Sequence, residues 1–257
     1  MTGAGAEVGE FRGRRVVITG AGGIYGRWFA RAFAEAGALL CLSDNRADAL
    51  AETVASLGLD RATTLTHVTE LRDEPSILSL AALVAERWGA PDIVINNAGI
   101  YPGKLLVETT TEDYDTIMGV NVRAPFILTR EMAKLMIAAG MRGSIIAIGS
   151  GAARKLRPSR VLYCTSKTML ERITKGFALE LAPHGIRVNI VEPGFAAGSE
   201  VSPLSEKHIA ETTAAIPLGR LTDWRDAPNA VMFLCSEKAA YITGTVLAVE
   251  GGNSLRL

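Results

Sequence analysis

Short apolar segments alternate with longer amphipathic segments along most of this chain, and this alternation constrains the fold more than any other feature. We predict strands at Val16–Ile18, Ala38–Leu42, Ala62–His67, Ile93–Ile95, Ser144–Ile148, Arg187–Val191 and Thr245–Glu250. We predict helices at Arg27–Ala36, Ala47–Leu57, Pro75–Gly89, Thr111–Ala139, Tyr163–Leu181 and Asp226–Ser236. Strands that alternate with helices form parallel, doubly wound sheets. The sequence therefore predicts an α/β fold with one sheet of about seven strands and helices on both faces.

The composition excludes several other kinds of protein. The 257 residues include 27 basic and 27 acidic ones, and such a balance favours neither nucleic acid nor an anionic membrane surface as a partner. No apolar run is long enough to span a bilayer, and the segment Met1–Glu10 does not resemble a secretory signal. Three isolated cysteines predict neither a disulfide framework nor a metal site. We expect one cytoplasmic domain without a metal ion.

A glycine-rich segment, T-G-A-G-G-I-Y-G at Thr19–Gly26, joins the first predicted strand to the first predicted helix. Glycines in this position let the backbone approach a phosphate, and the helix N-terminus offers free N–H groups and a positive dipole. Asp44 ends the second strand, where dinucleotide-binding folds place an acid on the ribose hydroxyls of the adenosine. Asp44 could instead cap the following helix. Because a carboxylate repels a 2′-phosphate, we favour NAD over NADP, although Arg46 is near enough to bind such a phosphate.

A second set of polar residues follows the strand Ser144–Ile148. Ser150 comes directly after this strand, and the helix predicted to begin at Tyr163 carries Lys167 one turn later. Lowering the pKa of a tyrosine by about three units requires about 4 kcal/mol of preferential stabilisation of the phenolate. An ammonium roughly 5 Å away supplies on the order of 3 kcal/mol. We therefore expect Lys167 to lower the pKa of Tyr163, and Ser150 to hydrogen-bond a substrate oxygen while Tyr163 moves its proton.

In their order along the chain, these motifs resemble the short-chain dehydrogenase/reductase family. The resemblance extends to N-N-A-G at Asn96–Gly99, to Asn121, to I-R-V-N before Pro193-Gly194, and to the C-terminal I-P-L-G-R and E-G-G segments. It implies a Rossmann-type fold and hydride transfer between a nicotinamide and a secondary alcohol or ketone. It also implies that Asn121 positions a water in the proton path and that Lys167 holds the ribose.

The resemblance assigns two sets of site residues. The catalytic residues are expected to be Asn121, Ser150, Tyr163 and Lys167. The cofactor is expected to contact Gly20, Gly23, Tyr25, Gly26, Asp44, Val68, Asn97, Ala98, Gly99, Tyr163, Lys167, Pro193 and Gly194. The segment 195–217 is expected to form a substrate lid over this site within a single NAD(P)-binding catalytic domain, residues 1–257.

Three positions depart from the family pattern. Ile24 replaces a glycine of the turn, which predicts a more crowded pyrophosphate pocket. His67 replaces an aspartate that bonds the adenine, and we expect His67 at the surface with Val68 contacting the adenine instead. Ala196, Ala197 and Gly198 stand near the usual place of a threonine that contacts the carboxamide, so that Ser199 is the nearest hydroxyl.

Three functions remain open. The first is an NAD-dependent oxidoreductase acting on a small secondary alcohol or ketone, whose substrate could carry an anionic group attracted by the basic loop of Arg154, Lys155, Arg157 and Arg160. The second is an NADP-dependent 3-oxoacyl thioester reductase, against which Asp44 argues. The third is a non-catalytic dinucleotide-binding sensor or scaffold. The family resemblance also implies a homodimer or homotetramer in which the two long helices form an interface.

Overall fold

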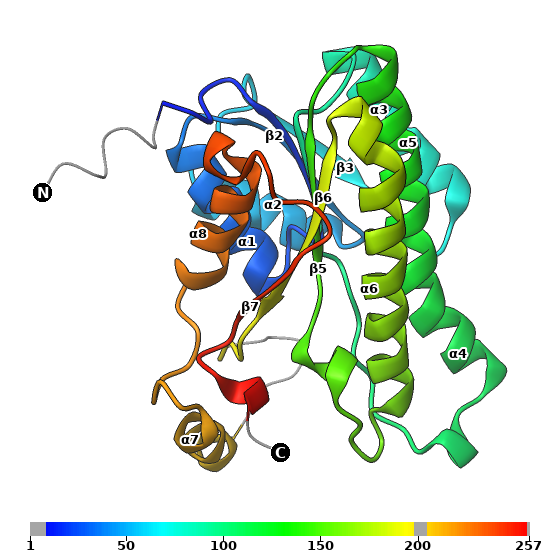
Figure 1. The fold of residues 1–257 in the computed structure, drawn as a ribbon, viewed down its shortest axis with the longest axis vertical. Helices are drawn as coiled ribbons and strands as arrows, with labels where there is room; N and C mark the ends of the chain where they lie inside the picture. Colours follow the sequence, from blue (N-terminus) through cyan, green and yellow to red (C-terminus); the bar gives the residue numbers. More distant parts are fainter. Residues whose placement is uncertain (1–8, 198–204, 256–257) are drawn as a thin grey trace, which may run out of the picture.

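The computed structural model describes residues 9–197 and 205–255. Their strands form one parallel sheet in the order β3-β2-β1-β4-β5-β6-β7, so the chain starts near the middle and winds outward in both directions (Figure 1). The strands are β1 Arg15–Thr19, β2 Leu39–Asp44, β3 Thr64–Val68, β4 Ile93–Asn96, β5 Ser144–Ile148, β6 Arg187–Pro193 and β7 Val246–Val249. The predicted doubly wound, Rossmann-type sheet is confirmed.

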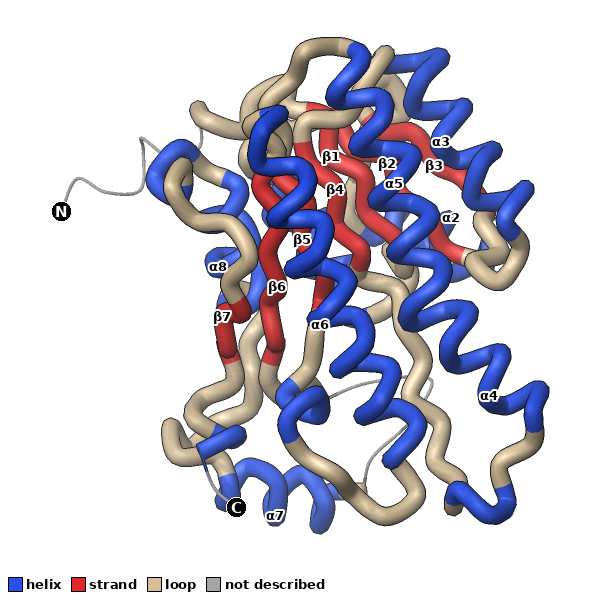
Figure 2. Tube along the Cα trace, turned by 45° about the vertical axis from the view of Figure 1, so that its right-hand side comes forward, coloured by secondary structure: helices blue, strands red, loops and turns tan. Residues whose placement is uncertain are grey.

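Helices cover both faces of the sheet (Figures 1 and 2). One layer contains α1 Ile24–Glu35, α2 Ala47–Ser56 and α8 Asp226–Cys235. The opposite layer contains α3 Glu74–Trp88, α5 Ala124–Ala138 and α6 Val161–Leu181. Two shorter helices, α4 Thr111–Met118 and α7 Glu206–Ala215, extend beyond the sheet on the side of the strands' carboxyl ends. Among the described residues, no helix combines the length and apolar character needed to cross a membrane.

The sheet separates two hydrophobic cores. Successive side chains of a strand point to opposite faces, and β1 accordingly sends Val16 and Ile18 to the core under α1 and Val17 to the core under α3 and α5. Phe29 and Phe33, one turn apart on α1, are fully buried against the first of these cores. Burying a side chain of this size contributes about 1.5–3 kcal/mol relative to leaving it exposed. The cores therefore hold the strand ends, and the residues that follow them, in place.

The long helix predicted at Thr111–Ala139 is interrupted. It begins as predicted with a capping box between Thr110 and Asp113, but a five-residue π-helical segment, Gly119–Arg123, separates α4 from α5. Such segments widen the backbone spiral locally and are frequent at functional sites. This one contains Asn121, and periodicity alone does not distinguish it from regular helix.

Two further boundaries differ from the prediction. Helix α6 begins at Val161 rather than Tyr163, so Tyr163 lies within its first turn. The segment 195–217, which shows little periodicity, contains helix α7. This helix has few buried apolar side chains to create a pattern, although Ile216 just after it is buried.

Candidate active site

The glycine turn after β1 is built around close backbone contacts. Gly20 has a φ of +65°, which favours glycine, and it lies against Ala98 of the neighbouring loop. A β-carbon on Gly26 would lie 2.7 Å from Cα of Ala21 and would overlap the carbonyl oxygen of Gly20. Helix α1 starts directly after Gly23 and has no side-chain cap. The turn is therefore tightly packed against its neighbours, and the uncapped start of α1 offers N–H donors to an anionic group such as a phosphate.

Asp44 fastens the turn from the end of β2. Its carboxylate is buried and accepts hydrogen bonds from the backbone N–H of Gly22 (2.9 Å) and of Arg46 (3.0 Å). The Arg46 guanidinium lies 3.7 Å from the same carboxylate. The alternative that Asp44 caps α2 is wrong, because Arg46 is the N-cap residue and α2 has no side-chain cap.

Tyr25 connects the glycine turn to the end of β6. Its hydroxyl donates a hydrogen bond of 2.8 Å to the carbonyl oxygen of Gly194, and its side chain also bonds to Thr222. Burial raises the pKa of Tyr25, so the phenol stays neutral. The Tyr25 hydroxyl is thus used to hold two loops together. Ile24 is the first residue of α1 and is half-buried.

The N-N-A-G segment supports the glycine turn, because the Asn97 side chain bonds to the backbone of that turn. Asn97 donates through Nδ2 to the carbonyl oxygens of Thr19 (2.9 Å) and Gly20 (3.0 Å). The Thr19 hydroxyl accepts from the backbone N–H groups of Asn97 (3.1 Å) and Ala98 (3.2 Å). These bonds join the loops after β1 and β4, and they make Asn97 a positioning residue for the turn.

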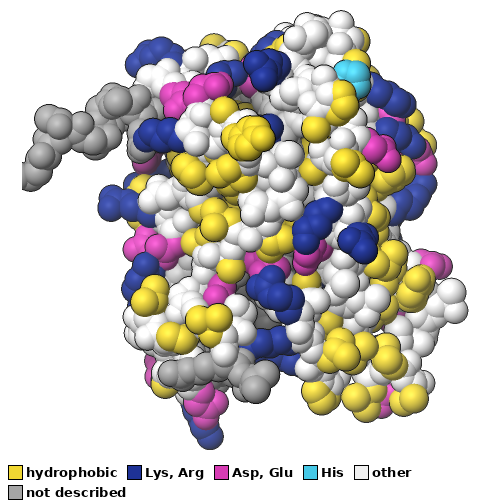
Figure 3. Space-filling model, in the orientation of Figure 1, with side chains coloured by type: hydrophobic (Ala, Val, Ile, Leu, Met, Phe, Trp, Pro, Cys, Tyr) yellow, Lys and Arg dark blue, Asp and Glu magenta, His cyan; other side chains and the backbone are white. Residues whose placement is uncertain are grey.

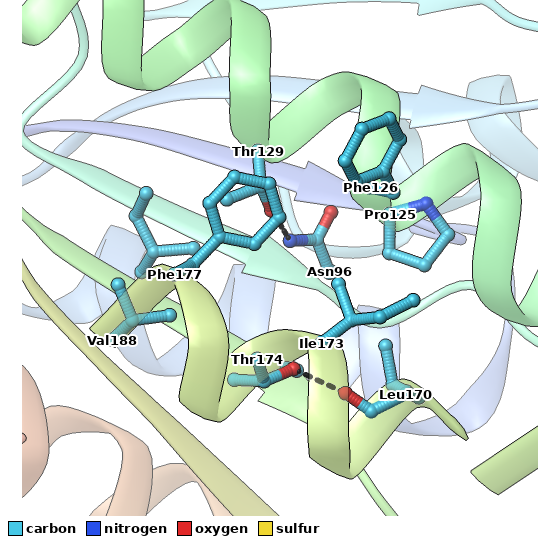
Figure 4. A pocket seen from close by; sticks show the side chains of 11 residues that line it. Asn96, Pro125, Phe126, Thr129, Leu170, Ile173, Thr174, Phe177 and Val188 are labelled. Carbon is cyan, nitrogen blue, oxygen red and sulfur yellow. Dashed lines mark hydrogen bonds between the residues drawn. The ribbon is translucent and has the colours of Figure 1, made fainter. Parts of the chain in front are cut away.

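Asn96 faces away from this edge. Its buried amide donates a 2.9 Å hydrogen bond to Thr129 of α5, and it lines a shallow apolar crevice between α5 and α6 (Figure 4). Asn96 thus ends β4 at the carboxyl edge of the sheet, but its side chain does not join the polar groups there. Its strand position directs its side chain into the helix layer, because successive residues of a strand alternate between the two faces.

Asn121 bridges two segments beside Lys167. Its Oδ1 accepts from the N–H of Ile100 (2.9 Å), while its Nδ2 donates to the carbonyl oxygen of Ile100 (2.8 Å) and to the hydroxyl of Ser166 (3.0 Å). These partners lie outside the helix of Asn121, so its side chain ties the π-helical segment to the loop after β4 and to α6. A β-carbon on Gly99 would lie 3.4 Å from both Asn121 Oδ1 and Lys167 Nζ. Gly99 thus leaves a small space bordered by both groups.

Ser150, Tyr163 and Lys167 converge after the end of β5. The Ser150 side chain is near enough to Tyr163 to oppose the rise in the pKa of the phenol, and the Ser150 hydroxyl accepts from the N–H of Ala152 (3.2 Å). The Lys167 Nζ lies 5.9 Å from the centre of the Tyr163 ring and donates to the carbonyl oxygen of Ile148 (2.9 Å). The sequence prediction that these three residues share one site agrees with this geometry.

The pKa of Tyr163 differs from the expectation. Burial raises it, and the opposing hydrogen bond from Ser150 and the positive charge of Arg160 do not reverse the shift. Burial likewise lowers the pKa of Lys167, to about 8, against the influence of the Glu192 carboxylate. The expectation from the sequence considered only the attraction between the phenolate and the ammonium. It omitted the desolvation of both groups, which disfavours their charged forms alike.

The buried ammonium of Lys167 predicts a pH dependence of stability. The folded pKa of about 8 lies below the ordinary value of 10.5, so between these pH values the unfolded chain binds more protons. Stability therefore rises with pH in this window, and we expect the rise to be on the order of 3 kcal/mol larger in the parent protein than in Lys167→Met. Denaturant unfolding at several pH values measures it.

Comparing the parent protein with Lys167→Met cancels the contributions of other titrating groups to the pH dependence of stability. Cys41 and Cys235 have pKa values raised by burial to about 12, so they oppose the rise in both proteins and cancel in the difference. Stability curves that run parallel from pH 8 to pH 10.5 would show that Lys167 is not the buried cation that the structure describes.

Glu192 is a site neighbour that the sequence analysis missed. Its carboxylate is almost fully buried at the end of β6, pairs with the guanidinium of Arg154, and has a pKa raised by burial. It also acts electrostatically on Lys167. An acidic residue inside the apolar run I-V-E-P was the available signal, because a buried acid requires a partner.

His67 lies in the edge strand β3, and its side chain is partly at the surface. The His67 ring is half-buried and hydrogen-bonds to the hydroxyls of Thr69 (2.7 Å) and Ser79 (3.2 Å), and burial lowers its pKa. Val68, paired with Asp44 across the strands, is 53% exposed. Val68 is therefore accessible for the apolar contact proposed for it.

The segment predicted as a lid lies partly within the described residues. Helix α7 lies below the carboxyl ends of β6 and β7 (Figures 1 and 2). Phe195 accepts a hydrogen bond from the backbone N–H of Thr222, and Leu218 donates to the carbonyl oxygen of Gly251. Ala196 and Ala197 are described, whereas Gly198 and Ser199 lie outside the described residues. Within the described part of the chain, no group of three or more His, Cys, Asp or Glu residues is arranged to hold a metal ion.

Comparisons with known proteins place this site in a family. The family model described as enoyl-(acyl carrier protein) reductase matches residues 20–254. Sorbitol dehydrogenase of Cereibacter sphaeroides is 32% identical, over 94% of this chain and 97% of that protein. The structure of 3-ketoacyl-(acyl-carrier-protein) reductase from Brucella melitensis complexed with NADH is 30% identical, with a TM-score of 0.85 over 95% of this chain and 99% of that one. NAD+-bound xylitol dehydrogenase is 27% identical, with a TM-score of 0.86 over 95% of this chain and 100% of that one.

The chain belongs to the short-chain dehydrogenase/reductase family, as its motifs implied. It is an NAD(P)-dependent oxidoreductase of the alcohol and ketone class.

Proposed function

We propose that this protein oxidises a secondary alcohol or reduces the corresponding ketone, with NAD as cofactor and Tyr163 as the general acid/base. The observation that carries the proposal is the convergence of Ser150, Tyr163 and Lys167 at the carboxyl ends of the strands, on the same edge of the sheet as the glycine turn and the uncapped start of α1. A pure nucleotide-binding sensor or scaffold has no need of this set of groups.

The residues of the turn fit a dinucleotide. The close backbone packing at Gly26 brings the glycine turn against the uncapped start of α1, whose N–H groups suit a pyrophosphate, and Asp44 suits the ribose hydroxyls of the adenosine. We assign the remaining cofactor contacts to Gly20, Gly23, Tyr25, Val68, Asn97, Ala98, Gly99, Tyr163, Lys167, Pro193 and Gly194, with Tyr25 and Asn97 acting mainly by holding the turn. A bound nicotinamide supplies the hydride acceptor or donor.

The side chains of this protein handle the proton. In the direction of oxidation, Ser150 hydrogen-bonds the substrate oxygen and Tyr163, as the phenolate, accepts its proton. In the direction of reduction, the neutral Tyr163 returns the proton to the same oxygen. Because burial disfavours the phenolate, positive charge must stabilise it, and Lys167 and Arg160 are the cations placed to do so. We assign to Asn121 the positioning of a water between Lys167 and solvent.

The direct experiment follows absorbance at the reduced-nicotinamide band with NAD or NADP and a panel of secondary alcohols and ketones. We expect turnover with NAD. Nucleotide binding without any turnover would support the sensor alternative. Turnover confined to NADP and 3-oxoacyl thioesters would support the reductase alternative. The similarity to 3-ketoacyl-(acyl-carrier-protein) reductase from Brucella melitensis is the reason to test this alternative.

The preference for NAD is proposed from Asp44. Its buried carboxylate would repel a 2′-phosphate, and the nearby Arg46 guanidinium is held against the carboxylate at 3.7 Å. We expect Asp44→Ala to lower kcat/KM with NAD about tenfold or more and to raise it with NADP, since a hydrogen bond to a charged group contributes about 1.5–3 kcal/mol.

The matched control for this change is Asp48→Ala, which removes the same charge from an exposed position in the first turn of α2. We expect Asp48→Ala to keep the preference of the parent. If Asp44→Ala also keeps it, Asp44 does not select the cofactor.

We propose a single catalytic domain, residues 1–257, with the segment 195–217 as a substrate lid, located in the cytoplasm. We also propose a homodimer or homotetramer. Exposed apolar side chains support an interface along α6, where Met169 is 41% and Leu179 is 78% exposed, and Phe126 packs against Phe177 beside the crevice of Figure 4. Sedimentation of the purified protein distinguishes these assemblies from a monomer.

A further inference from the structure

The four cations of the loop before α6 have different surroundings. Arg154 forms an ion pair with the buried Glu192, so its charge is already compensated. Lys155 donates a hydrogen bond of 3.3 Å to the carbonyl oxygen of Asn253. Arg157 is exposed to solvent. Arg160 alone among the four acts electrostatically on Tyr163.

Arg160 lies beside the proton-transferring group. It precedes Tyr163 by three residues, at the N-cap of α6, and its Nη1 donates to the carbonyl oxygen of Tyr101. Its Cζ lies 5.9 Å from the centre of the Tyr101 ring, and this ring meets the Tyr163 ring edge-on with 6.3 Å between centres. Arg160, Tyr101 and Tyr163 therefore form one continuous wall.

Local features keep this guanidinium in place. A β-carbon on residue 103 would lie 3.0 Å from Cζ of Arg160, so Gly103 provides the space that the guanidinium occupies. The backbone N–H of Lys104 donates a 2.7 Å hydrogen bond to the carbonyl oxygen of Ser159. This bond joins the segment after Gly103 to the loop that ends at Arg160, so both sides of the wall are fixed relative to each other.

The positive charge of Arg160 has no acidic partner within 4.0 Å among residues 9–197 and 205–255. The start of α6 adds to the positive potential, because the N-terminus of this 21-residue helix is the positive end of its dipole and has no side-chain cap. An uncompensated guanidinium at an uncapped helix start, next to an acid/base group, is a favourable place for an anion.

We propose that Arg160 binds the carboxylate of the substrate, so that the substrates of this protein are hydroxy acids and the corresponding keto acids. This inference rests on the proposed function and specifies its substrate class. One guanidinium balances the single charge of a carboxylate and matches its two oxygens, whereas a phosphate ester carries about −1.5 to −2 at neutral pH. The carboxylate lies at Arg160, and the carbinol oxygen lies between Ser150 and Tyr163.

Exposed apolar side chains follow Lys104 in sequence or lie in the basic loop, and they suit a short aliphatic body between these two polar ends. Leu105, Leu106 and Val107, the last two in the 3-10 helix η1 (Leu106–Glu108), are all exposed, and so is Leu156 of the basic loop. In Figure 3, hydrophobic side chains gather at the lower right of the molecule, the region that η1 occupies in Figure 1. The site thus combines one cation with an apolar border.

The test compares each acid with its neutral amide of nearly equal shape: 2- and 3-hydroxybutanoate against 2- and 3-hydroxybutanamide, in both enantiomers. In the parent protein, we expect a lower KM for at least one acid than for its amide. In Arg160→Gln, we expect the KM of that acid to rise about ten- to a hundredfold, as loss of a charge-assisted hydrogen bond predicts. Any change in kcat that acts through Tyr163 should be equal for acid and amide.

Two variants of the same chain sharpen the comparison. Arg157→Gln removes the same charge from an exposed position of the same loop and should leave the KM ratio of acid to amide unchanged. Arg160→Lys should restore part of the preference, because it keeps the charge but loses the two-pronged geometry. A parent without preference for any acid, or equal KM changes for acid and amide in Arg160→Gln, would overturn the proposal.

A second experiment distinguishes failure of the proposed oxidoreductase function from failure of the proposed anion site at Arg160. If no alcohol or ketone is turned over, calorimetric titration of the NAD-saturated protein with butanoate and with butanamide still tests the anion site. Butanoate binding that weakens at least tenfold in Arg160→Gln, with butanamide unaffected, would support the site without the enzyme activity. Equal binding of the two probes to the parent, or tighter binding of a phosphate ester than of butanoate, would overturn it.

Discussion

Replacing Tyr163 by phenylalanine is expected to lower kcat about 10²- to 10⁴-fold while changing the affinity for NADH far less, because Tyr163 is only one of many proposed cofactor contacts. The change removes one oxygen atom from a half-buried ring and keeps the packing of that ring against Tyr101. The phenol beside Ser150 is the proposed acceptor and donor of the substrate proton, so its loss removes this proton transfer. Turnover is measured by nicotinamide absorbance and affinity by the fluorescence of bound NADH.

A matched control is Tyr241→Phe, because the Tyr241 side chain is fully exposed and loses the same atom. We expect this variant to retain the kcat and thermal stability of the parent. If Tyr163→Phe turned over substrate as fast as Tyr241→Phe, another group would be the acid/base, although membership of the family would be unaffected.

The second large effect is expected for Gly26→Ala. The added β-carbon would lie 2.7 Å from Cα of Ala21 and overlap the carbonyl oxygen of Gly20, and neither backbone atom belongs to a flexible side chain. The glycine turn or helix α1 must shift, although α1 is held by the buried Phe29 and Phe33. We expect a loss of about 3 kcal/mol or more in the free energy of unfolding and loss of measurable NAD binding.

Chemical denaturation and calorimetric titration measure these two effects, and Gly176→Ala is the control. Gly176 lies inside α6, and a β-carbon there meets no atom within 4 Å. Alanine at this position should stabilise the protein by about 0.5–1 kcal/mol and leave NAD binding unchanged. Similar stability of Gly26→Ala and the parent would mean that the turn is more adaptable than its contacts indicate.

Much of the fold was predictable because it depends on local patterns. Buried parallel strands require continuous apolar runs, as in Ser144–Ile148, whose predicted bounds are those observed. The predicted start of the helix at Thr111 is also correct, because the capping box of Thr110 and Asp113 that begins it is local in sequence. The π-helical segment around Asn121 was not predictable in this way, because its side-chain partners, Ile100 and Ser166, are distant in sequence.

The site was predictable in its membership more than in its energetics. The spacing of Tyr163 and Lys167 along one helix placed them together, since residues four apart share a helix face. Their pKa shifts depend instead on how much water the fold removes from each group, and burial raises the pKa of Tyr163 while lowering that of Lys167. Spacing carries no information about desolvation.

The sequence by itself determined the alternating α/β architecture, the glycine turn and the identity of the acid/base candidates, because periodicity and short motifs specify local conformation. Only the tertiary structure decided which charges are compensated. Arg154 and Arg160 belong to the same basic loop, but strand β6 brings Glu192 to Arg154, whereas Arg160 lies against Tyr101 without an acid among the described residues. Long-range packing therefore separates a structural cation from one placed to bind a substrate.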